Sequence, residues 1–389
     1  MRSLKMNLIG ACVALFAAMA VAECAFATDM EFVKELVAIP SASADIPQVN
    51  RAMHTMKAYL EKRGVWCVME RHPGGNEILF AATRPGKVQD FIIAAHLDVV
   101  PASVEGQYDM KYRDGKIVGR GVSDCKGRCV VVAETLAKLN GKVSVGCIFG
   151  ADEELGGKMT RWMVEERGYK PGKMVIVADA RYGKVFYAHK GHCLIRLKAK
   201  GRGGHSARPW ECDDSITRLV RGYLKVREVW DARHPATDDQ WYDSVAPTIL
   251  RSEGEVMNRI PREAEIILNL RNVNPGAKDE LLGMIRKLTD CEAEVVRYSP
   301  PVNSNPDHPL VRGVLKAMRE VCGKGELDRM PGATDARCFV GCNVPIAIVG
   351  TLGGNAHGDD EWADPATFDL FGEWLARFLA NPDKYASVP

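Results

Sequence analysis

Five short motifs place histidines or acidic residues directly after runs of apolar residues. Imidazoles and carboxylates are the side chains that bind divalent metal ions and move protons. The motifs are FIIAAHLDVVP with His96 and Asp98, GRGVSDCKG with Asp124, FGADEELGG with Glu153 and Glu154, VIVADAR with Asp179, and GGNAHGDDEW with His357. One such motif alone would describe an ordinary charged loop, but five in equivalent positions indicate a common site.

The motif FGADEELGG sets three acids in a row, Asp152, Glu153 and Glu154, after an apolar stretch. Adjacent carboxylates repel one another and are costly to desolvate unless a cation lies among them. Taken alone, the motif fits a solvated loop at a strand end. Together with the other four, it favours two divalent ions about 3.5–4 Å apart, which can polarise a carbonyl and activate a water. Such a pair needs about five ligands, one of them shared, and a base that does not bind metal.

The elements that must position these residues alternate between apolar strands and helices. The runs FIIAAH (91–96), VSVGCIF (143–149) and MVIVAD (174–179) are continuously apolar, and residues 125–140 and 159–167 have helical patterns. Unbroken apolar strands alternating with helices predict a central, largely parallel sheet that is covered on both faces. The ligand crevice of such a sheet lies outside the carboxyl ends of its strands, where these motifs fall.

The pattern changes near Gly191, and LIRLKAK (194–200) alternates strictly, as expected of a half-exposed strand. Further helices and strands follow up to the turn-rich segment 299–306, after which the earlier alternation resumes at 310–321, 346–350 and 367–379. We therefore predict an α/β fold with a discontinuous catalytic domain and a smaller inserted α+β domain that serves as a lid or dimerisation unit. The predicted ranges are 28–190 and 300–389 for the first domain and 191–299 for the second.

The first 27 residues have the pattern of a secretory signal peptide. Arg2 and Lys5 precede an apolar segment (8–22), and the small-residue sequence AFA follows at 25–27. The apolar segment is short for a permanent membrane span. An uncleaved anchor and a misassigned start are the alternatives. We expect export to the periplasm, with no stable membrane span after processing.

Composition excludes several classes of partner. The 389 residues carry a net charge of +2 without a long basic run, which argues against nucleic acid. The 46% hydrophobic and 26% charged residues are typical of a soluble globular protein. The cysteines show no CxxC framework, so we expect most of them to be buried as small hydrophobic residues. A zinc site made of Cys125, Cys129, Cys338 and Cys342 is disfavoured, because neither segment has zinc-finger spacing.

Six segments together resemble one zinc-dependent family, which contains acetylornithine deacetylase, succinyl-diaminopimelate desuccinylase, aminoacylase, glutamate carboxypeptidase and related dipeptidases. The segments are HLDVVPA, GRGVSDCKG, ADEELGG, GRGGHSARP, GATDARCF and AHGDDEW. They occur in order from about Met30 to the C-terminus, and they are specific for the family but not for a substrate. The resemblance implies hydrolysis of an amide bond by two divalent metal ions, with zinc expected and cobalt or manganese as alternatives.

The resemblance also implies a role for each residue of the site. His96 and Asp179 would bind one metal ion, and Glu154 and His357 would bind the other. Asp124 would bridge the two ions. Asp98 would orient His96. Glu153 would be the general base, while Asp152 receives no role. Many relatives carry Glu where this chain has Asp179, although dipeptidase-like members carry Asp.

Three further residues are implied outside the metal ligands. His205 and Asn258 lie in the inserted domain, and the resemblance implies that they stabilise the oxyanion, with His205 reaching into the site of a partner subunit in a homodimer. Arg337 would bind the free carboxylate of an amino-acid substrate, because guanidinium pairs with carboxylate in a bidentate manner. A surface-loop histidine and a surface arginine are the plainer alternatives.

The substrate class stays open at this level. The segment SVEGQYDMKYRDGK after VVPA lacks the Trp and Asp-Pro-Phe of many relatives, so no single relative supplies the substrate. We expect either a small peptide or an N-acyl amino acid, and we favour an exopeptidase or dipeptidase over a deacylase. A catalytically silent relative that only binds amino acids is the alternative of another class, although no ligand and no base is lost.

Overall fold

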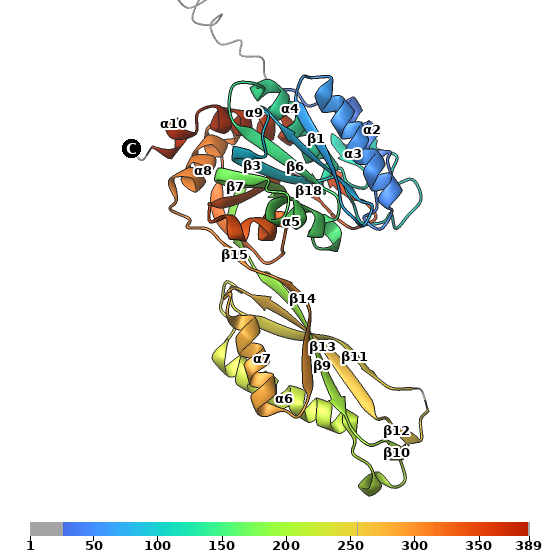
Figure 1. Ribbon diagram of the computed structural model, residues 1–389. Coiled ribbons are helices and arrows are strands. Elements are labelled where there is room, and N and C mark those ends of the chain that lie inside the picture. Colours follow the sequence, from blue (N-terminus) through green and yellow to red (C-terminus); the bar gives the residue numbers. More distant parts are fainter. Residues whose placement is uncertain (1–25, 255, 388–389) are drawn as a thin grey trace, which may run out of the picture.

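The computed structural model describes residues 26–254 and 256–387, which form two hydrophobic cores. The larger core draws on both ends of the chain, and the smaller one runs from Cys193 to Cys291. Figure 1 shows the two bodies one above the other, joined by a narrow neck. Residues 1–25 of the predicted signal peptide lie outside the described residues. Within the described residues, no helix is long and apolar enough to cross a membrane.

The larger body is built on a nine-stranded sheet in which β16 pairs with β8 outside the main path β1-β2-β6-β3-β7-β17-β8-β15. At its centre β3 pairs in parallel with β6 and β7, and β7 pairs in parallel with β17. Every residue of β6 and β17 is buried, as expected of strands covered on both faces. The predicted, mostly parallel α/β sheet is thereby confirmed. The strands are β1 (Trp66–Arg71), β2 (Glu77–Ala82), β3 (Val88–His96), β6 (Val145–Gly150), β7 (Lys170–Arg181), β8 (Lys184–His189), β15 (Val302–Asn303), β16 (Glu326–Met330) and β17 (Ile346–Thr351).

Helices from both ends of the chain cover this sheet (Figure 1). Helix α4 packs on β3, β6 and β7 and against α9, which in turn packs on α8. The helices are α2 (Met30–Val37), α3 (Ile46–Glu61), α4 (Lys126–Leu139), α5 (Lys158–Glu165), α8 (Pro309–Cys322), α9 (Ala366–Ala380) and α10 (Pro382–Ala386). A separate small sheet joins β18 (Gly353–Gly354), β19 (Trp362–Ala363), β5 (Lys116–Val118) and β4 (Lys111–Arg113). The loop that contains His357 connects β18 with β19.

The smaller body, which we call the lid, is an antiparallel sheet covered on one face by two helices. Its strand order is β11 (Ser244–Ser252), β13 (Glu263–Asn272), β9 (Gly191–Lys200) and β14 (Glu292–Ser299). Helices α6 (Ser215–Arg233) and α7 (Ala277–Leu288) pack on it. Alternate residues of β9 are buried, which leaves Arg196 and Lys198 on the open face, as the strict alternation predicted. Strand β9 begins and strand β14 ends at the predicted limits of the inserted domain, residues 191 and 299.

The cysteines in the described residues are all free, and most of them are buried. Cys125 and Cys129 both contact the backbone of His96, and their sulfur atoms are 3.9 Å apart. Among the described residues no group that contains a cysteine is placed to hold a metal ion. The buried, apolar role predicted for most of these thiols agrees with their positions.

Candidate active site

The parallel register of three central strands brings the predicted motifs together. His96 ends β3 and pairs with Gly150 at the end of β6, so the acidic turn after β6 lies beside it. On the other side of β3, Ala94 pairs with Val177 of β7, which places Asp179 at the level of His96. The carboxyl ends of parallel strands lie at the same edge of the sheet, so the acids and imidazoles that follow these strands are close together.

Asp124 lies between two imidazoles, one from each half of the larger body. Its Oδ1 is 3.1 Å from Nε2 of His96, and its Oδ2 is 3.3 Å from Nε2 of His357. The same His357 nitrogen is 3.1 Å from Oε2 of Glu154. Asp124 thus offers one carboxylate oxygen to each of two histidines.

Two overlapping groups of side chains have ligand atoms within 4.8 Å of one another: His96 with Asp124 and Glu154, and His96 with Glu153 and Asp179. The Oε1 atom of Glu154 is buried without a hydrogen-bond partner. A buried carboxylate oxygen without a donor requires another positive partner, and imidazole and carboxylate are the ligands that zinc prefers. The residues present therefore fit a metal centre. The side chain of His357 is 54% exposed, which leaves this side of the site open to solvent.

Hydrogen bonds to Asp124 and Glu154 raise the pKa of His357 to about 10. The shift reflects the negative field of the two carboxylates, which a divalent cation would equally satisfy. Asp179 shows the same crowding, because burial and then the charge of Asp124 raise its pKa to about 7.

Asp98 fixes the orientation of His96 and ties it to the acidic turn. His96 Nδ1 is 2.9 Å from the carbonyl oxygen of Asp98 and 3.5 Å from its carboxylate, so the donor proton belongs on Nδ1 and the lone pair on Nε2. The carboxylate of Asp98 also accepts bonds from the backbone N–H groups of Glu153 and Glu154 and from the Ser43 hydroxyl. The geometry therefore agrees with the orienting role predicted for Asp98, which stays a prediction until it is tested.

Glu153 belongs to the second of these groups, and its side chain, which is 11% exposed, is held by a cation. Its Oε1 accepts a hydrogen bond of 3.1 Å from Nη2 of Arg337, which is also 3.5 Å from Asp335. Burial and the charge of Asp335 raise the pKa of Glu153 well above its ordinary value, although Arg337 and His96 act in the opposite direction. A carboxyl group with a raised pKa is suited to accept and return a proton near neutral pH.

Arg337, predicted as a binder of substrate carboxylate, is buried beside Glu153. It is 7% exposed, and its Nη2 also donates to the backbone carbonyl of Glu153. These contacts make it a neighbour of the predicted base. Whether it also meets a substrate stays a prediction.

Asp152, for which we predicted no role, caps the helix that follows the acidic turn. Its two carboxylate oxygens accept from the backbone N–H groups of Lys158 and Met159, at 2.8 and 3.0 Å. The chain turns back through Gly157, which has a φ of +64°, and a Cβ there would lie 2.0 Å from an oxygen of Asp335. Only glycine fits this position, and the cap with this glycine fixes where Glu153 and Glu154 stand.

Arg128 is a buried cation of the site that sequence reasoning missed. Its Nη2 lies 3.2 Å from Oδ1 of Asp179 and 3.7 Å from Oδ1 of Asp124. It also donates to the backbone carbonyls of Ala180 and Ser123. One oxygen of a predicted metal ligand is thus already engaged by a guanidinium. The only sequence signal was a basic residue four positions after Asp124, in the first turn of α4.

A second buried pair, Arg120 with Glu361, holds the loop that carries Asp124. The two side chains are each 1% exposed and their atoms are 2.9 Å apart. The Glu361 carboxylate also accepts from the backbone N–H groups of Gly121, Ser123 and Asp124. The motif AHGDDEW contains Glu361, but nothing in its spacing distinguishes that acid from its neighbours.

His205 and Asn258 are not brought to this site within one chain. His205 is exposed in β10 (Gly204–His205), which pairs with β12 (Arg259–Ile260) at the far end of the lid (Figure 1). The two residues lie near each other, because the backbone N–H of Ser206 donates to the carbonyl of Asn258. Their predicted role in the site of a partner subunit stays a prediction.

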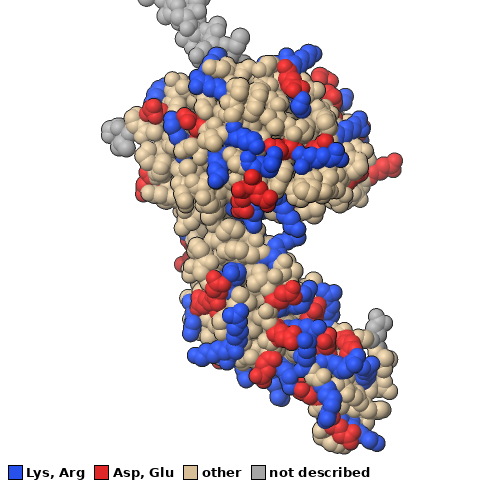
Figure 2. Space-filling model, viewed as in Figure 1, with Lys and Arg blue, Asp and Glu red and all other residues tan. Residues whose placement is uncertain are grey.

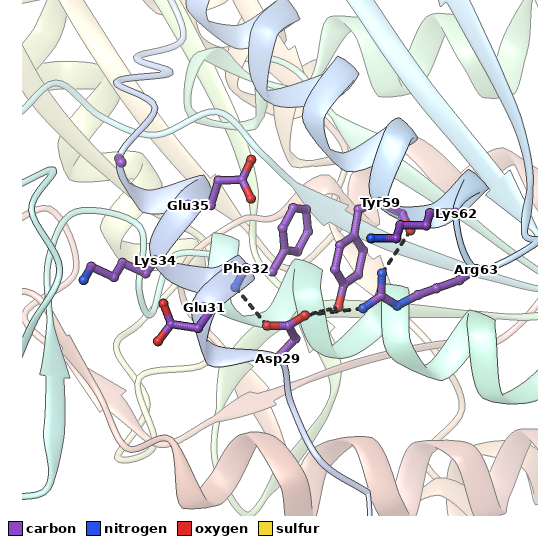
Figure 3. Close-up of a pocket in the computed structure, with 9 residues that line it drawn as sticks. Asp29, Glu31, Phe32, Lys34, Glu35, Tyr59, Lys62 and Arg63 are labelled. Carbon is purple, nitrogen blue, oxygen red and sulfur yellow. Dashed lines mark hydrogen bonds and ion pairs between the residues drawn. The ribbon is translucent and has the colours of Figure 1, made fainter.

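A cavity of about 610 Å³ lies elsewhere, against α2 and α3 (Figure 3). Its polar groups already satisfy one another. The hydroxyl of Tyr59 and the guanidinium of Arg63 both donate to Asp29, and Tyr59 stacks on Phe32 with ring centroids 3.6 Å apart. None of the predicted site residues lines this cavity, and we assign no chemistry to it.

Comparison with known families agrees with the fold and the site. Residues 92–381 match the model of peptidase family M20/M25/M40, and the chain belongs to this family. It is therefore an enzyme of a metal-dependent class of hydrolases, as the resemblance predicted.

Relatives and solved structures place the chain among peptidases and deacylases. It is 24% identical over 341 residues to a probable succinyl-diaminopimelate desuccinylase of Staphylococcus aureus, covering 74% of this chain and 83% of that protein. It is 24% identical over 351 residues to the succinyl-diaminopimelate desuccinylase of Wolinella succinogenes, covering 85% and 93%. The fold is similar to that of aminopeptidase PepT from Bacillus cereus, with a TM-score of 0.73, 18% identity and 90% and 96% coverage. An M20 family metallo-carboxypeptidase from Sulfolobus solfataricus gives a TM-score of 0.73, 17% identity and 90% and 98% coverage.

Proposed function

We propose that this protein is a two-metal exopeptidase or dipeptidase that cleaves an amide bond of a small peptide. The observation that carries the proposal is the position of Asp124 between His96 and His357, with the largely buried carboxyl group of Glu153 beside them. In this proposal His96 and Asp179 hold one metal ion, Glu154 and His357 hold the other, and Asp124 is shared. Zinc is the first choice, with cobalt or manganese as alternatives.

Divalent ions bound there would polarise the scissile carbonyl and lower the pKa of a water molecule. The protein's own side chains move the protons. Glu153 accepts a proton from the attacking water at its carboxylate and returns it to the nitrogen of the leaving amine. Arg337 holds Glu153 in place, and Asp98 keeps His96 in the tautomer that leaves Nε2 free.

We further propose that the enzyme acts as a homodimer. His205 and Asn258 are too far along the lid to serve their own site, whereas the same residues of a second copy could donate hydrogen bonds to the oxyanion. Light scattering combined with activity of His205→Ala tests this arrangement. A fully active monomer would exclude it.

A second candidate function is removal of an acyl group from an N-acyl amino acid. The observation that favours it is the similarity to desuccinylases over most of the chain. The dipeptidase-like Asp179 favours the peptidase. Export to the periplasm, which we propose from the N-terminal segment, suits the recovery of peptides or acylated amino acids.

The decisive experiment compares matched substrates on the metal-loaded protein that begins at Thr28. Amine release by mass spectrometry would be followed for Xaa-Yaa dipeptides against N-acetyl- and N-succinyl-amino acids with the same C-terminal residue. We expect cleavage of the free-amine peptides. Cleavage of only the acylated compounds would replace the peptidase with the deacylase. Silence towards all of them, with metal bound, would leave only the binding of amino acids.

A further inference from the structure

The loop that carries His357 has little regular structure to support it. It runs between β18 and β19, which have two residues each, and the side chain of His357 is 54% exposed. The backbone of His357 has a φ of +66° and that of Asn355 a φ of +54°. Residues other than glycine rarely adopt this left-handed conformation, and they keep it where surrounding contacts impose it. The position of this proposed metal ligand therefore depends on its neighbours.

Gln107 supplies such contacts from the segment that follows β3. Its Nε2 donates to the carbonyl oxygens of Gly358 and Asp359, the two residues after His357, at 2.9 and 2.8 Å. Its Oε1 accepts from the backbone N–H of Ser103 at 2.7 Å, so both ends of the amide are engaged. Gln107 is only 6% exposed. One buried amide thus ties the loop of His357 to the segment around Ser103.

These bonds differ from the charged contacts on the molecular surface. Figure 2 shows basic and acidic side chains side by side on the face of both bodies that is in view. Exposed ion pairs of that kind stabilise a structure little, because water and salt compete for the charges. A buried amide is shielded from that competition, so the hydrogen bonds of Gln107 can hold the loop in one position.

The two histidines of the site are supported in different ways. His96 ends a buried strand and is 2% exposed, and its Nδ1 bonds to Asp98. His357 reaches Asp124 and Glu154 through Nε2. Within the part of the chain that the structure describes, no residue bonds to its Nδ1. The imidazole of His357 is therefore positioned through its backbone, whereas that of His96 is also held by its ring.

We infer that Gln107 is a positioning residue for the proposed metal site, because its bonds to the loop set the place of His357. It thereby sets the affinity for the ion that His357 holds together with Glu154. The inference rests on the proposed function and adds to it a residue outside the shared motifs. Gln107 lies in the segment that lacks the Trp and Asp-Pro-Phe of many relatives, so this support belongs to the chain's own sequence.

Zinc titration of metal-free Gln107→Ala, in competition with a chromophoric chelator, tests the inference. We expect one of the two zinc ions to bind about tenfold or more weakly, as is typical when a residue that orients a metal ligand is replaced. The other ion should bind as in the unmodified protein. Unchanged affinity for both ions, or an equal loss for both, would overturn the inference.

Gln89→Ala is the matched control. Gln89 is 2% exposed, and its Nε2 donates to the carbonyl oxygens of Arg84 and Gly86 at 3.1 and 2.7 Å. It lies near the start of β3, at the opposite end of the strand from His96. Both replacements remove a buried amide from the same body, but only Gln107→Ala should change the zinc affinity. The same change in Gln89→Ala would make the effect a general loss of stability and contradict the inference.

Gln107→Glu provides a second variant in case the alanine variant does not fold. It keeps the size of the side chain and an acceptor for the N–H of Ser103, and it removes the donors to the loop. The same selective loss of one zinc ion is expected. Normal affinity for both ions in a folded Gln107→Glu variant would refute the role of these donors.

A double-mutant cycle with His357→Ala shows whether Gln107 acts through that ligand. His357→Ala alone should weaken the same ion, and adding Gln107→Ala should have no further effect. Independent, additive losses would rule out the assignment. If His357→Ala leaves both affinities unchanged, the proposed two-metal site fails together with this inference. If His357→Ala weakens one ion and Gln107→Ala does not, the inference alone fails.

Discussion

Replacing Glu153 with glutamine removes the proposed base and changes little else. Oε1 of Glu153 accepts from Arg337 at 3.1 Å, and the amide oxygen of glutamine can accept the same bond. The backbone N–H of Glu153 still donates to Asp98. Glu153 is absent from the group formed by His96, Asp124 and Glu154, and in the second group, with His96 and Asp179, glutamine still offers an amide oxygen, so metal should be retained. The loss is then confined to proton transfer, which contributes about 10²–10⁴-fold to the rate, or about 3–5 kcal/mol of transition-state stabilisation.

The assay measures kcat on the best substrate and the metal content by mass spectrometry in the same preparation. Glu165→Gln, an exposed acid at the end of α5, is the control and should behave as the unmodified protein. Since the pKa of Glu153 is raised and the base must be ionised, activity should increase with pH through a limb above the ordinary glutamate range. A Glu153→Gln variant that binds metal and keeps more than about a tenth of the normal kcat would refute the reasoning.

Three further changes test other parts of the structure. Arg128→Met removes a positive charge 3.2 Å from Asp179, so the affinity for zinc at that position should rise by about tenfold or more in a titration of metal-free protein; weaker binding would instead make Arg128 an orienting residue. Gly157→Ala should lower the free energy of unfolding by more than about 1 kcal/mol in a denaturation assay, because the added Cβ meets a carboxylate. Gly141→Ala is the control, because Gly141 has a φ of +71° but lies in open space, and it should cost only the conformational strain of about 1 kcal/mol. Burial lowers the pKa of His189 to about 4, so the free energy of unfolding should fall by up to about 3 kcal/mol as the pH decreases from 6.5 towards 4. His189→Gln should flatten this dependence in denaturation curves recorded at pH 4.5 and 7.5.

The positions of the predicted metal ligands followed from the sequence because the ends of the apolar strands can be recognised there. Continuous apolar runs marked β3, β6 and β7, and the acids and histidine directly after them had to meet at one edge of a parallel sheet. His357 was harder to place, since it lies in a loop between two short strands far along the chain. His357 was assigned as a ligand from its motif together with the other motifs, because hydrophobic periodicity gives no signal in this loop.

Residues that support the site escaped sequence reasoning because their roles depend on partners distant in the chain. Arg120 and Glu361 are 241 positions apart, and the local sequence around each of them does not predict a buried ion pair. Asp152 looked like one acid among three until its two bonds to the start of α5 were visible. Arg337 was predicted to bind a substrate carboxylate, and only the fold shows that it lies against Glu153.

The sequence by itself determined the class of fold, the residues that gather at the strand ends and the membership of a metal-dependent hydrolase family. Those features are local, because periodicity reports burial and motif spacing reports which side chains follow a strand. Tertiary structure alone decided which carboxylates are paired and that Arg128 lies against Asp179. Charge balance is a sum over neighbours in space, and neighbours in space are fixed only once the strands and the two bodies are packed together.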